Sequence, residues 1–136
     1  MKVIIHGGFF SESSTNQEMK LAKQNALAEI VTKAHAFLAS NTALDTVVYA
    51  VSLLEDSELF NAGIGSQIQS DGKVRLSASL MDGKSQKFSG VINLEDVKNP
   101  IEVAKQLLAY DDRVLSGEGA LAFSRANGHD YFNPIT

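Results

Sequence analysis

Two glycines, Gly63 and Gly65, mark the point at which the chain changes its hydrophobic pattern, and this change most constrains the fold. Before them, apolar residues recur at spacings of three and four, which is typical of amphipathic helices. After them, short apolar segments are bounded by turn residues, which is typical of strands. The chain must therefore combine helices with a sheet, and we predict an α+β fold.

Two helices are predicted before the glycines. Ser14-Thr15-Asn16-Gln17 carries a capping signature that opens a long helix, and Thr42-Ala43-Leu44-Asp45 repeats it for a second one. The joint between the two helices is short, so we expect an antiparallel pair. The predicted apolar faces hold Ala22, Ala26, Leu27, Ile30, Val31, Ala34, Phe37 and Leu38 in the first helix, and Leu44, Val47, Val48, Val51 and Leu54 in the second.

Strands are predicted on both sides of this helix pair. Lys2 to Ile5 is a short apolar run that ends at His6-Gly7-Gly8, as a buried strand entering a loop would. Farther along, Gln67 to Gln69 and Val74 to Leu80 flank an Asp71-Gly72 pair. That pair tolerates positive φ at both central positions of a tight turn, so we predict a hairpin.

The remainder of the chain predicts one more strand and two more helices. Phe88 to Leu94 is a second apolar run after the hairpin. Asn99-Pro100 supplies a cap and a first-position proline for a helix, and a last helix is expected from Gly117-Glu118-Gly119 to Asn127-Gly128. The apolar residues expected to face inward from the third helix are Ile101, Val103, Ala104, Leu107 and Leu108.

Composition excludes several classes of function. A net charge of −4 without a Lys/Arg cluster argues against nucleic acid or an anionic membrane as partner. The absence of cysteine excludes disulfides, thiolate zinc sites and a cysteine nucleophile. The apolar start is too short for a signal peptide, and no segment is apolar enough to cross a bilayer, so we expect a cytoplasmic protein. We predict a single domain over 1–136, with 129–136 as an extended or mobile tail.

Several motifs in this order resemble the N-terminal half of the isoaspartyl peptidase/plant-type asparaginase family. The resemblance extends from about Val3 to about Gly128. The motifs that carry it are His6-Gly7-Gly8, Leu44-Asp45, Leu59 to Ser66, Met81-Asp82-Gly83, Asn99-Pro100-Ile101 and Gly117-Glu118-Gly119-Ala120. Each is weak alone, and their order and spacing make the resemblance specific.

The resemblance implies half of an N-terminal-nucleophile hydrolase. Such enzymes are four-layer αββα sandwiches made as a precursor and cut in two, which frees a threonine at the start of the β-subunit. This chain would be the α-subunit of an (αβ)2 assembly, acting on β-aspartyl dipeptides or on the side-chain amide of asparagine. Because the nucleophile's own amine serves as the base, the threonine must begin a chain. We therefore expect no catalytic residue here, and no organic cofactor.

The resemblance also implies a sodium ion in the loop before the glycines. A hard cation of this kind is held well by main-chain oxygens and needs no charged side chains. The carbonyls that would hold it belong to Leu54, Glu55, Ser57, Phe60, Ala62 and Ile64. Glu58 stands where proline is common in the family, so this loop is expected to be less rigid.

Three residues are expected at the wall of the active site. The resemblance places the Asn61 amide there, where it can both donate and accept hydrogen bonds. Gly7 and Gly8 would let the backbone approach the partner's threonine closely. The structural alternatives are a turn-forming asparagine and a tight strand exit, and the sequence leaves both open.

Some positions depart from the family pattern. Phe9-Phe10 follows the two glycines where small residues are usual, and Ser77 replaces an acidic residue. Glu118 is expected to favour the N-terminus of its helix through the helix dipole. A degenerate non-enzymatic homologue or interaction domain therefore remains an alternative to the hydrolase, and a glycosylasparaginase-like amidase is a second one.

Overall fold

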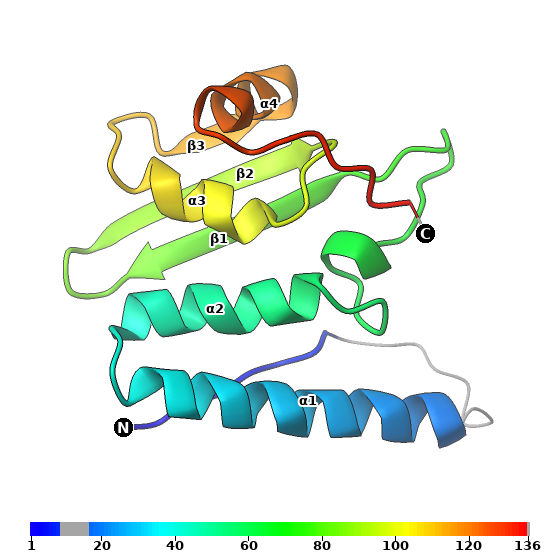
Figure 1. Cartoon of the computed structure of the whole chain (residues 1–136). Helices are drawn as coiled ribbons and strands as arrows, with labels where there is room; N and C mark the ends of the chain where they lie inside the picture. Colours follow the sequence, from blue (N-terminus) through cyan, green and yellow to red (C-terminus); the bar gives the residue numbers. More distant parts are fainter. Residues whose placement is uncertain (9–16, 136) are drawn as a thin grey trace.

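The computed structural model describes residues 1–8 and 17–135 and contains four α-helices, a short 3₁₀ helix and a mixed sheet within them. The helices are α1 (Gln17–Leu38), α2 (Ala43–Glu55), α3 (Pro100–Leu107) and α4 (Gly117–Ala126), and η1 covers Gly63–Gly65. The strands are β1 (Leu76–Asp82), β2 (Lys87–Leu94) and β3 (Val114–Ser116). Figure 1 shows their arrangement. The predicted mixture of helices and strands is confirmed.

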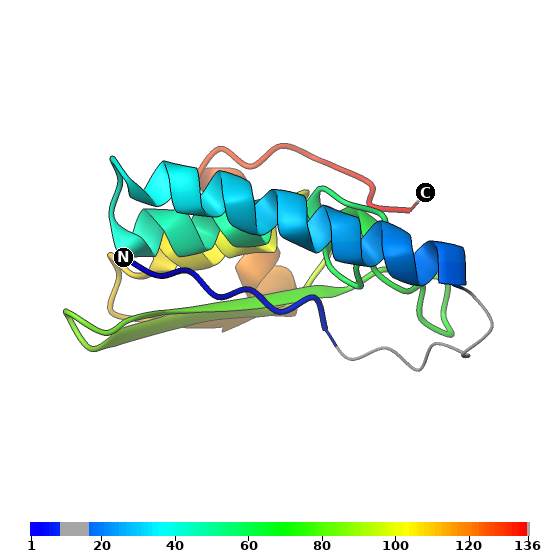
Figure 2. The same cartoon turned by 90° about the horizontal axis from the view of Figure 1, so that it is seen from below.

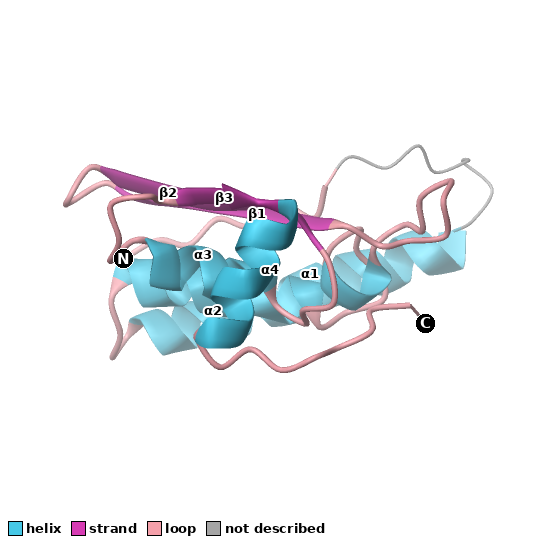
Figure 3. Cartoon of the chain, turned by 90° about the horizontal axis from the view of Figure 1, so that it is seen from above, coloured by secondary structure: helices cyan, strands magenta, loops and turns pink. Residues whose placement is uncertain are grey.

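The sheet is three strands wide, with β2 in the centre. β1 and β2 are antiparallel, and β2 and β3 are parallel. All four helices lie on one side of the sheet, as Figures 2 and 3 show. The opposite face carries no element of the described chain. The strands therefore have one face covered by helices and one face open.

Three apolar clusters hold the helices on the sheet and on each other. The first joins β2, α3 and α4, the second joins α2, β1 and α3, and the third joins α1, α2 and the loop after α2. Their buried members are Val91, Leu94, Val97, Val103, Leu107 and Ala120; Val48, Leu80, Ile101 and Ala104; and Ile30, Leu54 and Phe60. α2, α3 and α4 therefore pack on the sheet, and α1 packs beside α2, away from the strands (Figures 1 and 2).

The four predicted helices are present. The caps of α2 and α4 follow the sequence signals, whereas the Asn99 side chain makes no capping hydrogen bond to α3 and donates instead to Glu55 and Asp56. The hydroxyl of Thr42, the N-cap of α2, accepts a hydrogen bond from the Asp45 amide at 3.1 Å. Pro100 occupies the first turn of α3, and Gly128 follows α4 with φ +84°. The capping residues 14–16 before α1 lie outside the described residues. Val47 was wrongly placed on the buried face of α2, because α1 and α3 leave it half exposed.

The predicted strand at Lys2 to Ile5 is wrong. Residues 1–8 form neither helix nor strand, and the Ile4 side chain is 92% exposed. Ile5 instead packs on the cluster of Ile30, Leu54 and Phe60. A strand needs a hydrogen-bonding neighbour, and the described part of the chain provides none at this position.

The hairpin forms at a different turn from the predicted one. Asp71-Gly72 does make a turn, in which the Gln69 amide donates to the Lys73 carbonyl at 2.8 Å, but no ladder extends from it. β1 pairs forward with β2 through the turn 83–86. Asp82 closes this turn by accepting hydrogen bonds from the Lys84 and Ser85 amides. The inner faces of β1 and β2 are then buried together under α3, which decides the pairing.

The segment after α4 is irregular but held in place over its described length. The Arg125 guanidinium donates to the carbonyl oxygens of His129, Asp130 and Asp96 at 2.8 to 3.0 Å. The Phe132 amide also donates to the Asp96 carbonyl at 3.1 Å. Residues 129–135 therefore follow the body of the molecule without forming a helix or strand.

Candidate functional site

A polar pocket of about 330 Å³ lies where the loop after α2 meets the start of β1. Its walls come from the end of α2, the loop 61–67, the turn before β1 and the first turn of α3. The side chains and backbone that line it include Glu55, Asn61, Gly63, Gln67, Arg75 and Ser77. The structure therefore brings the predicted wall residue Asn61 together with part of the predicted sodium loop.

The side-chain amide group of Asn61 closes the loop 61–67 with its oxygen atom and faces the pocket with its nitrogen atom. Its Oδ1 accepts a hydrogen bond from the Gln67 amide at 3.1 Å, which joins the two ends of the loop 61–67. Among the described residues no acceptor is present for its Nδ2 group, and the residue is exposed. Nδ2 can therefore donate to a molecule in the pocket while Oδ1 maintains the loop.

Glu55 is a buried carboxyl group at the end of α2. Its side chain is 2% exposed and accepts hydrogen bonds from the Ile101 amide and the Asn99 side chain, both at 3.2 Å. Burial raises the pKa of Glu55 to about 8, against the opposing effect of these two hydrogen bonds. The neighbouring acids Asp56 and Glu102 raise that pKa further.

The predicted sodium loop is folded tightly around η1. A Cβ atom at Gly63 would collide with the Glu55 carbonyl, and one at Gly65 would collide with the Phe60 carbonyl. The same atom at Gly65 would also lie 2.8 Å from the Ser57 carbonyl oxygen. Three of the six predicted carbonyls therefore pack closely against the two glycines, and neither position has room for a side chain.

The other three carbonyls of the predicted sodium set lie in the same succession of turns. The Leu54 carbonyl accepts from the Ser57 amide at 3.2 Å, and the Ala62 carbonyl accepts from the Gly65 amide at 3.1 Å. The Ile64 carbonyl lies in η1 itself. No group of three or more His, Asp or Glu side chains that could hold a metal occurs within the described residues. The sodium ion stays a prediction that depends on main-chain oxygens.

Gly7 and Gly8 lie beside the loop rather than in the lining of the pocket. A Cβ atom at Gly7 would stand 3.0 Å from the Phe60 ring and 3.2 Å from Leu27 of α1. Gly8 has φ +90°, a backbone conformation that favours glycine. Gly7 therefore allows a close approach to the loop. Phe9 and Phe10, whose effect on the pocket was in question, lie outside the described residues.

An ion-pair network at the rim was not predicted from the sequence. The Arg75 guanidinium bonds the Asp71 carboxylate at 2.7 Å and that of Glu95 at 3.0 Å, and it also donates to the Gln69 side chain. Lys73 pairs with Glu95 at 3.0 Å. The network joins the Asp71-Gly72 turn to Glu95, which directly follows β2. The sequence signal that could have predicted this network is the position of Arg75, four residues after Asp71 and across the predicted turn.

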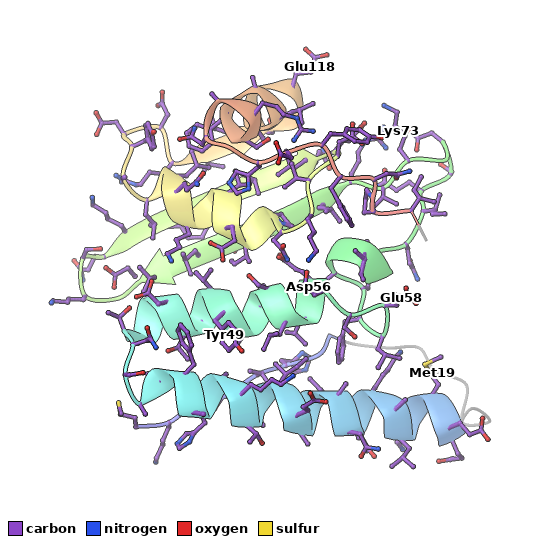
Figure 4. The ribbon with its side chains drawn as sticks, in the orientation of Figure 1. Met19, Tyr49, Asp56, Glu58, Lys73 and Glu118 are labelled. Carbon is purple, nitrogen blue, oxygen red and sulfur yellow. The ribbon has the colours of Figure 1, made fainter. Side chains whose placement is uncertain are left out.

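Glu118 lies apart from the pocket, as Figure 4 shows by comparison with Asp56 and Glu58. It occupies the first turn of α4, where a carboxylate complements the helix dipole, as expected. Of the described helices, none has the length and apolar character needed to span a bilayer.

Comparisons with known proteins identify relatives of this chain. The chain is 46% identical over 137 residues to the isoaspartyl peptidase/L-asparaginase of Synechocystis sp., covering 99% of this chain and 41% of that protein. It is 39% identical to the plant-type L-asparaginase of Pyrococcus horikoshii, covering 98% of this chain and 44% of the relative. It is 37% identical to the isoaspartyl peptidase of Salmonella typhimurium, with coverage of 97% and 44%.

The chain spans less than half the length of the curated relatives it matches. A model of the family described as asparaginase matches residues 1–136. The order of motifs, the glycine-containing loop and these identities all point the same way, and the chain belongs to the asparaginase family.

Proposed function

We propose that this chain is the α-subunit of an isoaspartyl peptidase/L-asparaginase. The enzyme would hydrolyse β-aspartyl peptide bonds or the side-chain amide of asparagine. Its nucleophile would be a threonine that autocleavage of a common precursor exposes at the start of a β-subunit. The observation that carries the proposal is the pocket in which the Asn61 amide faces outward beside the glycine-containing loop. The activities for which the relatives are named support the reaction class.

The chemistry assigns a limited task to this chain. The threonine hydroxyl of the partner would attack the substrate carbonyl, release ammonia or an amine, and leave an ester that water then hydrolyses. A preorganised donor near the reacting carbonyl stabilises charge as it develops. The Nδ2 group of Asn61 is placed to be such a donor or to orient the substrate.

The open face of the sheet is an argument for the proposed second polypeptide. Met81, Phe88, Ile92 and Val114 are about half exposed or more on this face, and small residues separate them. Such a face packs well against another sheet at a spacing of roughly 10 Å. β1 also has one unpaired edge in the described chain. A β-subunit sheet on this face would complete the four-layer αββα sandwich, and pairs of such heterodimers would form the (αβ)2 assembly.

A sodium ion would have a structural role in this proposal. The carbonyls of Glu55, Ser57 and Phe60, which pack closely against Gly63 and Gly65, would supply half of its expected ligands. Bound there, the ion would stabilise the loop that carries Asn61. It takes no part in bond breaking.

The subunit composition and the activity are tested first. We expect intact-mass analysis of the purified protein to show a second polypeptide that begins with threonine. We also expect that protein to hydrolyse a β-aspartyl dipeptide or asparagine. A single 14.6 kDa species without either activity would contradict the proposal, and hydrolysis of glycosylated asparagine alone would support the glycosylasparaginase-like alternative.

The role of Asn61 is tested with a pair of variants. Asn61→Asp keeps an acceptor for the Gln67 amide and removes the Nδ2 donor, whereas Asn61→Ala removes both. If Nδ2 serves the reaction, both variants lose roughly 100-fold in kcat, by analogy with removal of an oxyanion donor. Only Asn61→Ala should also lower the melting temperature. Normal kcat in Asn61→Asp would assign the residue to loop closure.

A further inference from the structure

The buried carboxylate of Glu55 joins α2 to α3 without an ionic partner. Oε1 accepts from the Ile101 amide in the first turn of α3, and Oε2 accepts from the Asn99 side chain, each at 3.2 Å. Within residues 1–8 and 17–135, no lysine or arginine forms a salt bridge with it. A buried carboxyl group that loses its hydrogen-bond partners is costly, so the two hydrogen bonds are essential to its position.

The main chain of the same residue contacts the loop that carries Asn61. The Glu55 carbonyl oxygen lies so close to Gly63 that a Cβ atom there would collide with it. Gly63 has φ +52° and follows Asn61 by two residues. A displacement of Glu55 would therefore be transmitted directly to the loop 61–67.

The surrounding surface contacts do not replace this connection. Asn99 donates a second hydrogen bond to Asp56 at 3.1 Å, and Asp56 pairs with Lys98 at 3.0 Å. Figure 4 places Asp56 between α2 and the start of α3. Both members of this pair are substantially exposed, and such pairs contribute little to stability. Glu55 is thus the buried link between α3 and the loop.

We propose that Glu55 is a positioning residue, whose side chain fixes the end of α2 on α3 so that its own carbonyl and the loop 56–66 hold Asn61 in place. The proposal rests on the proposed function for its effect on catalysis. It assigns to the side chain a task separate from the sodium contact expected of the carbonyl. In this role the Glu55 side chain would not touch the substrate.

The test compares three variants in the complete enzyme. Glu55→Ala removes both hydrogen bonds. Glu55→Gln keeps an oxygen for the Ile101 amide, and the Asn99 amide can turn over to accept from the new NH₂ group at the expense of its exposed hydrogen bond to Asp56. Glu102→Gln is the matched control, because it removes a carboxylate from the same corner and leaves the link intact. For each variant, hydrogen exchange of the amides in 61–66, kcat and KM are measured, with melting temperatures in sodium chloride and choline chloride.

We expect Glu55→Ala to lower kcat by roughly 100-fold with little change in KM, because a displacement of about 1 Å near the reacting centre has this effect. Amides 61–66 should exchange at least about tenfold faster than in Glu102→Gln, with β1 unchanged. Any stabilisation by sodium relative to choline should be lost. Glu55→Gln should restore kcat and exchange to within a few-fold of the control.

Unchanged exchange in 61–66 together with normal kcat in Glu55→Ala would overturn the proposal. If the wild-type enzyme shows no hydrolysis, the proposed function fails, and the exchange comparison still decides the role of Glu55. If Glu55→Ala does not fold, Asn99→Ala removes one of the two hydrogen bonds. It should then give smaller changes in the same direction, and no change in exchange there would equally overturn the proposal.

Discussion

The two faces of the sheet differ although the same strands form them. On the inner face Leu76, Leu80, Val91 and Leu94 are at most 3% exposed, whereas on the outer face Met81, Phe88, Ile92 and Val114 are between 47% and 67% exposed. An antiparallel sheet with one face in water usually alternates apolar and polar residues. Here both faces carry large apolar side chains. The strands therefore have the residue pattern of a sheet that is covered on both faces. The described chain covers the inner face alone.

The outer face is also shaped for contact. Met81 lies directly opposite Phe88, and Ser79 lies opposite Gly90. A pair of large apolar side chains therefore lies next to a pair of small residues. Exposed apolar surface of this kind marks interaction sites. The helices cover the inner face because α3 and α4 follow β2 and β3 closely in the chain.

The largest expected effect comes from placing a charge on the outer face. Ile92→Asp should weaken association with the second polypeptide by on the order of 100-fold or more, because burying an unpaired carboxylate costs several kcal/mol. The control is Val47→Asp on α2, since Val47 is as exposed as Ile92 but lies away from the sheet. Native mass spectrometry or co-purification measures the assembly, and equal assembly in both variants would mean that the outer face is free.

A smaller effect is expected from a cavity on the inner face. Leu94 is fully buried in the cluster under α3 and α4, so Leu94→Ala should lower the free energy of unfolding by about 2 to 5 kcal/mol. Val47→Ala on the exposed side of α2 should change it by less than about 0.5 kcal/mol. Urea denaturation of the purified protein gives both values. Similar losses for the two would show that the inner face is not the core.

The smallest effect distinguishes two serines on opposite faces. The Ser89 hydroxyl is buried and donates to the Ala104 carbonyl of α3, whereas Ser79 is exposed on the outer face. Ser89→Ala should cost about 1 kcal/mol, because the Ala104 carbonyl loses that partner. Ser79→Ala should be neutral for unfolding. Thermal melts of both variants compare the faces, and a neutral Ser89→Ala would show that this hydrogen bond contributes nothing net.

Local signals predicted most of the elements. Thr42 and Asn99-Pro100 marked the starts of α2 and α3, and Gly128 marked the end of α4, because capping depends on residues adjacent in sequence. The partner of β1 was not predictable in this way. Asp71-Gly72 had the stronger turn signal, yet the turn after Asp82 makes the hairpin, since burial under α3 rewards that pairing.

The candidate site was predicted in part. Asn61 and the glycine-containing loop followed from the resemblance, and the structure gathers them in one pocket. Arg75 and Gln67 were missed because no local pattern says which side chains a folded loop will place together. The sodium ion, the β-subunit and the four-layer sandwich stay predictions.

By itself the sequence determined the family, the helix boundaries and the presence of strands, because periodicity, caps and motif order act over a few residues. Only the tertiary structure decided that residues 2–5 remain unpaired, that β1 pairs with β2, and that the Glu55 carboxylate joins α3 to the loop of Asn61. These outcomes depend on contacts between residues far apart in the chain. Their free energy comes from burial and from the pairing of buried polar groups, which no local pattern contains.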